Sequence, residues 1–168
     1  MASLTAPIKT PEAAPGVQIS LAVKDSTTVY AGALVAINSS GKAEPAADAS
    51  GLRAVGRAEN TASNGAAVRI RRKGVFRYAN DTVDAVTAAM YGQVCYVKDD
   101  HTVSSSAGTY AVVAGRVVRV DADGVWVEMD GGAFAPSAAI TDLATTPAAS
   151  DVNAILAALR KAGIIANS

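Results

Sequence analysis

Hydrophobic and polar residues alternate in short runs along most of this chain. Between residues 16 and 130, runs rich in Val, Ile and aromatic residues are separated by Gly, Asn, Asp and Ser, which is typical of β-strands joined by tight turns. No helical pattern of comparable strength lies between them, so we predict a mainly β fold, a small antiparallel β-barrel or sandwich. The expected strands are GVQISLAV, GALVAI, LRAVGRA, AAVRIRR, GVFRYA, GQVCYV, TYAVVAGRVVRV and VWVEM.

The stretch AGRVVRVDADGVWVEMD, residues 114–130, predicts a β-hairpin. Alternation along its second arm places Val125, Val127 and Met129 on one face. Trp126, the only tryptophan of the chain, then lies on the opposite, polar face.

Two arrangements could cover Trp126. A second sheet, a linker or a terminal helix could pack on it, as is usual for large aromatic side chains. Alternatively, Trp126, with Val117 or Arg119 as its cross-strand neighbour, forms part of a surface that another subunit or a partner completes. The first predicts that Trp126→Ala costs fold stability, and the second that it costs mainly assembly.

The ends of the chain differ from its middle. Half of the prolines lie in the first 15 residues, without apolar periodicity, and this favours an extended arm. The segment GGAFAPSAAITDLATT indicates a linker. We therefore predict four parts: an extended arm over 1–15, a β-barrel or sandwich domain over 16–130, a linker over 131–146, and a helix with a tail over 147–168.

Helix signals agree at both ends of PAASDVNAILAALRKAG, residues 147–163. Thr146 or Ser150 can cap the start, and Pro147 suits a first helical position. Gly163 suits the residue that follows a helix end.

One side of this helix carries an apolar stripe. A helix of about 12 to 16 residues is only marginally stable alone in water, so we expect the stripe to dock. It can dock on its own β domain or bundle with copies of itself, since the opposite side is mostly alanine. The stripe consists of Val152, Ile155, Leu156 and Leu159.

The β region also contains a weak internal repeat. YAGALVAI is followed by AVGRAE, and later YGQVCYV is followed by VAGRVV. In each half a Tyr and a Gly precede a strand, and Gly-Arg comes further on, as expected where a strand turns or bulges in a curved sheet. The other interpretation is chance similarity between Gly- and Val-rich strands.

Composition narrows the functional classes. The formal net charge is zero, so there is no general electrostatic case for nucleic acid or an anionic membrane as a partner. No apolar run approaches the roughly 20 residues of a membrane helix, and MASLTAPIKTPEAAPG is unlike a signal peptide. We expect a protein that stays in the cytoplasm where it is made. The single Cys95 cannot form a disulfide within the chain.

The order of these motifs resembles that of capsid cement or head decoration proteins of tailed bacteriophages. The resemblance covers about residues 17–130 and is most specific where VGRA leads through NGAAVRI to KGVF. The segment ITDLATTPAASDVNAILAALRKAGII is similar to the closing segments of phage head-fibre proteins. The resemblance implies a β-rich structural protein on the outer capsid surface of the virion, made in the host cytoplasm, which binds the major capsid protein and is often a homotrimer.

Candidate chemistry does not point to an enzyme. His101 lies beside Asp99 and Asp100, where a solvated turn explains the residues better than a metal site, since no second His or Cys stands at a useful spacing. Asp121 and Asp123 fit a hairpin turn better than a calcium loop. We therefore predict no metal.

Cys95, in QVCYV, suits a buried core thiol better than a nucleophile. Neither a phosphate loop nor a dinucleotide fingerprint nor a nucleophile elbow occurs in the sequence. We therefore predict no catalytic residue and no cofactor.

The one marked charge feature is a basic cluster. Alternation places three of its members on one face of a strand and Arg72, with Ile70, on the other. Three interpretations are open: a solvated, charged strand face or sheet edge, a contact for acidic groups of a capsid or a neighbouring subunit, or a contact for nucleic acid. The cluster consists of Arg69, Arg71, Arg72 and Lys73.

Two functions follow as expectations. The first is a cement protein that bridges major capsid protein subunits. The second is a head-fibre or receptor-contact module that binds a host-surface glycan or protein. Binding to empty capsids without host cells present would favour the first function. Binding to host envelopes would favour the second.

Overall fold

A computed structural model describes residues 17–130 and 149–161. The chain divides into two compact units, Met1–Phe134 and Ala135–Ser168. All the described strands belong to the first unit, and the described helix belongs to the second. The prediction of a mainly β fold with one C-terminal helix is confirmed. The predicted arm over 1–15 and linker over 131–146 lie outside the described residues.

Each of the eight expected runs contains a strand. Four further strands, β2, β4, β6 and β10, are only two or three residues long, too short to produce a periodic signal. The strands are β1 (Gln18–Ala22), β2 (Thr28–Val29), β3 (Leu34–Ile37), β4 (Ala43–Pro45), β5 (Arg53–Ala58), β6 (Ala62–Ser63), β7 (Ala67–Arg71), β8 (Lys73–Asn80), β9 (Val94–Val97), β10 (Thr102–Ser104), β11 (Val113–Asp121) and β12 (Gly124–Asp130), with a short 3-10 helix η1 (Ala88–Met90) before β9.

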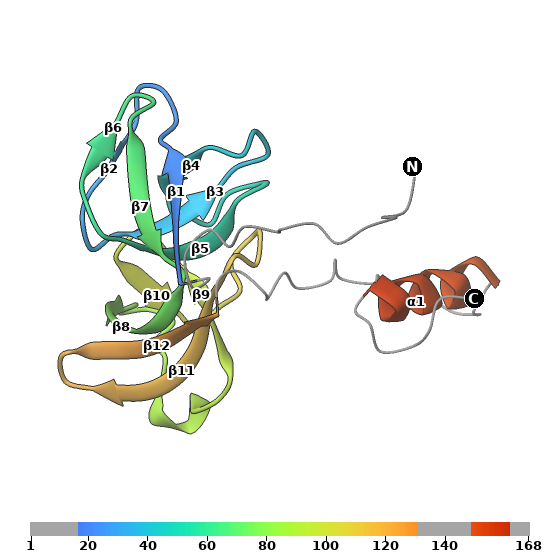
Figure 1. The fold of residues 1–168 in the computed structure, drawn as a ribbon. Coiled ribbons are helices and arrows are strands. Elements are labelled where there is room, and N and C mark those ends of the chain that lie inside the picture. Colours follow the sequence, from blue (N-terminus) through green and yellow to red (C-terminus); the bar gives the residue numbers. More distant parts are fainter. Residues whose placement is uncertain (1–16, 131–148, 162–168) are drawn as a thin grey trace, which may run out of the picture. The chain divides into compact units, whose positions relative to one another are not determined.

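The strands form two sheets of the same connectivity (Figure 1). The first has the order β1-β7-β5-β3-β4, and a parallel bridge between Val23 and Ala43 joins its two ends. The second has the equivalent order β8-β12-β11-β9-β10 and closes into a barrel through the parallel pair β8 and β10. The two sheets are here called the first and the second barrel, and β2 pairs separately with β6.

Backbone registers show that the internal repeat is real. Ala36 pairs with Ala54 in the first barrel, as Tyr96 pairs with Val113 in the second. Main-chain bonds repeat as well, because the N–H of Gly32 donates to Ala58 and the N–H of Gly92 donates to Val117, both at 2.8 Å. The alternative of chance similarity is therefore wrong for these segments.

The hairpin expected over 114–130 is present as β11 and β12. Val125, Val127 and Met129 are buried, as the alternation predicts. Gly124 takes a φ of +141° at the end of the turn, a conformation that glycine adopts without strain.

Part of the outer face of the first barrel is buried in the core of the second barrel. Val35 packs inside the first barrel, whereas its neighbours Leu34 and Ala36 are buried in the cluster formed by the interior of the second. The N–H of Leu34 also donates to the carbonyl of Asp100 at 2.7 Å. Residues of β3 are therefore buried on both faces, and the two barrels share a core.

Hydrogen bonds between polar loops also hold the two barrels together, at what is here called the joint. The carboxylate of Asp48, which follows β4, accepts the N–H groups of Thr109 at 2.6 Å and Tyr110 at 2.8 Å. This connects a loop of the first barrel to a loop of the second.

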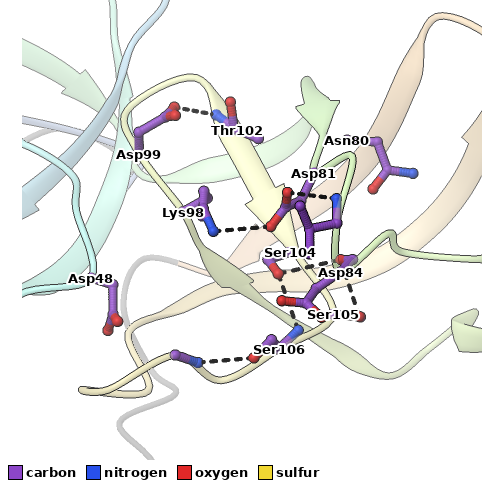
Figure 2. A network of polar contacts seen from close by, with 12 residues as sticks. Asp48, Asn80, Asp81, Asp84, Lys98, Asp99, Thr102, Ser104, Ser105 and Ser106 are labelled. Carbon is purple, nitrogen blue, oxygen red and sulfur yellow. Dashed lines mark hydrogen bonds and ion pairs between the residues drawn. The ribbon is translucent and has the colours of Figure 1, made fainter.

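A second polar network holds one end of the second barrel (Figure 2). Lys98 points at the buried Asp81 with 3.4 Å between Nζ and Oδ2, and the N–H of Val83 donates to the other carboxylate oxygen of Asp81 at 3.1 Å. The hydroxyl of Ser105 donates to the carbonyl of Asp84 at 3.1 Å. These bonds fasten the loop after β8 to the turn after β9 and to the segment after β10.

The helix of the second unit is α1 (Ala149–Lys161). Ser150 lies within it, so the expectation that Ser150 precedes and caps the helix is wrong. Thr146, Pro147 and Gly163 lie outside the described residues.

Candidate interaction surface

Trp126 stands on the outer face of the second barrel and is held there by its own hairpin. Its register partner is Arg119, whose guanidinium carbon lies 4.6 Å from the ring centroid. The indole N–H donates to the carboxylate of Asp121 at 2.8 Å, and Arg119 forms an ion pair with the same carboxylate at 2.8 Å.

A bulge between Val117 and Arg119 decides this arrangement. Val117 is buried and pairs with Val127, so of the two expected neighbours only Arg119 lies beside Trp126. Trp126 remains half-buried.

The hydrogen bond from Trp126 is the main cause that holds the pKa of Asp121 below its ordinary range, and the N–H of Asp123 and the charge of Arg119 act in the same direction. The carboxylate is therefore ionised at neutral pH and orders the indole.

Trp126 lines one side of a groove of about 620 Å³ between the two barrels. Tyr30 is 64% exposed and Val75 is 44% exposed, so large apolar side chains are open to a partner. Aromatic and Arg side chains are the anchors that protein interfaces favour. The residues that line the groove include Tyr30 and Arg57 from the first barrel, and Val75, Phe76, Arg77, His101 and Trp126 from the second.

Arg57 is the central cation of this groove. Its guanidinium carbon lies 4.9 Å from the centroid of Phe76, and its Nη2 lies 2.6 Å from Glu59. Nε of Arg57 is buried with no hydrogen-bond partner in the part of the chain that the structure describes. The groove is thus lined by one Arg–aromatic pair, Arg57 on Phe76, and by Trp126, whose ring also contacts Arg119 outside the groove lining.

Sequence reasoning identified Trp126 but missed Arg57, Phe76 and Tyr30. These residues come from β5, β8 and the turn before β3, and only the packing of the two barrels brings them together. The glycine-arginine pattern at Arg57 was the one signal that pointed to this region.

The basic cluster lies elsewhere. Arg69 and Arg71 are exposed on β7, Arg72 is half-buried between β7 and β8, and Lys73 lies 3.8 Å from Asp130. Arg71 pairs in register with Arg57, and two like charges opposite each other are destabilising. The expectation that Arg69, Arg71 and Lys73 share one face of a single strand is wrong, because β7 ends at Arg71 and Lys73 begins β8 in the other sheet. All three are exposed, and none of them lines the groove.

The apolar stripe of α1 is described in part. Val152 is 48% exposed, and Ile155 and Leu156 are half-buried. The side chain of Leu159 lies outside the described residues.

The polar turn at His101 is built by Asp99. The carboxylate of Asp99 accepts the N–H groups of His101 at 2.8 Å and Thr102 at 2.7 Å. Within residues 17–130 and 149–161, no three His, Cys, Asp or Glu side chains gather as a metal site. The carbonyl of His101 accepts the N–H of Ala79, which is part of the parallel closure of the barrel.

Cys95 is a core residue, as expected. It is fully buried, and its thiol donates to the carbonyl of Gly115 at a distance of 3.7 Å. Burial raises the pKa of this thiol to about 12. The thiolate that a nucleophile requires is therefore scarce at neutral pH.

No known protein family matches the chain, and neither do the curated proteins or the solved structures to which it was compared. In the part of the chain that the structure describes, no helix combines the length and the apolar character that a membrane crossing requires.

Proposed function

We propose that this chain is a non-enzymatic structural protein of a tailed-phage virion, which binds the outer surface of the capsid and stabilises it by bridging major capsid protein subunits. One observation carries the proposal. The segment with the most specific resemblance to cement proteins, VGRA through NGAAVRI to KGVF, folds as β5, β7 and β8 and supplies Arg57 and Phe76 to the groove.

The groove has the composition of a protein-binding site. Trp126 and Phe76 each contact an Arg, and these two guanidinium groups already form ion pairs with Asp121 and Glu59. The groove therefore favours a partner segment with apolar side chains and hydrogen-bond acceptors. The joint of the two barrels is held by a shared core and by Asp48, so the groove walls are fixed before binding. Preorganisation reduces the entropy lost on binding.

Bridging stabilises a shell through linkage. A protein that binds the assembled shell and not its separate subunits shifts the assembly equilibrium toward the shell. Many copies, each of modest affinity, multiply this effect.

The proposal includes self-association as a homotrimer, with the stripe of α1 as one contact between copies. Val152 is exposed on α1, and a short helix needs a docking partner. Deletion of residues 147–168 is expected to lower the oligomeric mass measured by light scattering. An unchanged mass would refute this role of the helix.

Capsid binding is testable with expanded shells assembled without this protein. Shells and purified full-length chain are mixed, sedimented together, and the bound chain is quantified. The wild-type chain is expected to saturate the shells and to raise the temperature at which they rupture. Trp126→Ala is expected to lower the affinity for the shells about tenfold, the cost of an interface anchor of average strength.

A matched control is Val83→Ala, which truncates an exposed side chain outside the groove. It is expected to bind like wild type. Binding of the chain to host cell envelopes but not to shells would replace the proposal by a receptor-contact function.

The basic cluster provides a separate contact to test. The double variant Arg71→Glu with Arg72→Glu is expected to weaken shell binding, and more strongly at low salt than at high salt. Unchanged occupancy at all salt concentrations would assign the cluster to a solvated sheet edge.

A further inference from the structure

At the joint between the two barrels, the outer face of the first barrel packs on one end of the second barrel. Leu34, Ala36 and Ala54 point out of the first barrel and are buried in the core cluster of the second. On the receiving side Phe76 lies at the groove between the barrels, and Tyr78 is 2% exposed. A joint of this kind therefore needs two surfaces. One barrel supplies an apolar outer face, and the other supplies the end that receives it.

The second barrel repeats that outer face without a cover among the described residues. The pairs Leu34–Arg57 and Ala36–Ala54 correspond to Val94–Arg116 and Tyr96–Val113. The equivalents of the three buried residues are thus Val94, Tyr96 and Val113, here called the Tyr96 face, and all three are only half-buried.

Exposed aromatic side chains continue the Tyr96 face along the chain. Tyr91 is 73% exposed just before β9, and Tyr110 is 52% exposed just before β11. Tyrosine is enriched in protein interfaces, where it supplies apolar area and a polar group together.

The first barrel repeats the receiving end. The pairs Phe76–Val127 and Tyr78–Val125 of the second barrel correspond to Ile19–Ile70 and Leu21–Val68 of the first. Ile19 and Leu21, here called the Leu21 end, are half-buried, whereas Tyr78 is almost fully buried beneath the joint. Each chain therefore carries both halves of a second joint.

We propose that a second copy of this chain occupies these surfaces, with the Tyr96 face of one copy on the Leu21 end of the next. The covered joint within the chain is the argument for this occupant, because a barrel of the same connectivity already binds the equivalent face. Such contacts are heterologous and repeat from copy to copy until a ring closes. The inference is independent of capsid binding.

Sedimentation velocity of the free full-length chain over a range of concentrations tests this. The wild-type chain is expected to associate with rising concentration. Tyr96→Glu and Leu21→Glu each place a charge in an apolar contact, so each is expected to weaken self-association at least ~tenfold. The matched control is Val83→Glu, which puts the same charge on a valine 82% exposed and is expected to associate like wild type.

Mixing the two variants distinguishes head-to-tail contacts from other modes. The Tyr96→Glu chain keeps an intact Leu21 end, and the Leu21→Glu chain keeps an intact Tyr96 face. Their equimolar mixture is therefore expected to recover the association that each variant lacks alone, because one intact Tyr96 face can still meet one intact Leu21 end. If two Tyr96 faces pack on each other instead, Leu21→Glu associates like wild type, which overturns the proposal.

Three other results also overturn the proposal. The wild-type chain could stay monomeric at every concentration, or it could associate in a way that neither variant weakens. Association that only Leu156→Glu on α1 abolishes would assign the contact to the helix instead. If circular dichroism shows that either charged variant is unfolded, Val94→Lys or Ile19→Lys replaces it on the same surface. The same mixing result is then required of the replacement pair.

Discussion

Gly56 and Gly115 occupy equivalent bulges in the two barrels. A Cβ at Gly56 would collide with the carbonyl oxygen of Arg71, and a Cβ at Gly115 with the carbonyl oxygen of Glu128. Both obstacles are main-chain atoms of the neighbouring strand, which side-chain rotation cannot move. The repeat therefore preserves a close backbone approach at the equivalent place in each barrel.

Gly115→Ala is expected to lower the free energy of unfolding by about 3 kcal/mol, because the sheet must open to admit the methyl group. Urea unfolding measures the change. The control Gly41→Ala, where no atom lies within 4 Å of the new Cβ but φ is +76°, is expected to cost about 1 kcal/mol. Equal losses for the two variants would contradict the close approach.

Asp48→Ala is expected to loosen the joint between the barrels. It removes the acceptor of the N–H groups of Thr109 and Tyr110, and we expect a loss of about 1–2 kcal/mol in urea unfolding. Hydrogen exchange of those two amides is expected to quicken more than exchange inside β12. Asp48→Asn, which keeps one acceptor oxygen, is expected to lose less than Asp48→Ala.

Trp126 fluorescence is expected to report the ionisation of Asp121. Trp126 is the only tryptophan, so the signal has one source. The pKa of Asp121 is lowered in the folded state, chiefly by the indole hydrogen bond, so the emission is expected to change with a midpoint below the ordinary aspartate range. The Asp121→Asn variant is expected to lack this transition while remaining folded.

Asp81 is expected to contribute to acid sensitivity. Its folded pKa is lowered, first by the N–H of Val83 and then by Lys98. A lowered folded pKa means stabilisation that is complete above the unfolded pKa and is lost as pH falls through the folded value. Asp81→Asn is therefore expected to be less stable at neutral pH and to show a flatter decline of unfolding free energy in acid. An unchanged slope would contradict the shift.

Much of the barrel could be predicted from the sequence because alternation is a local property. It placed Val125, Val127 and Met129 inside, and all three are buried. It could not place β4 or β10, which are three residues long and are strands only because longer neighbours provide hydrogen bonds.

Of the residues that line the groove, the sequence pointed only to Trp126 as a candidate for an interaction surface. The sequence marked Trp126 as unusual, but its neighbour depended on the bulge between Val117 and Arg119, and a register change of one residue reverses which side chains share a face. Arg57 and Phe76 meet across two barrels, and no short-range pattern encodes that contact.

The sequence by itself determined the strand rhythm, the repeated glycine positions and the C-terminal helix, because side-chain periodicity and turn chemistry act between near neighbours. Only the tertiary structure decided that β3 is buried on both faces and that the parallel pair β8 and β10 closes the second barrel. It also decided that one face of the repeat is buried while its equivalent is half-buried among the described residues. The physical reason is that alternation indicates which face of a strand is apolar, but the partner of that face is chosen by packing between segments far apart in the chain.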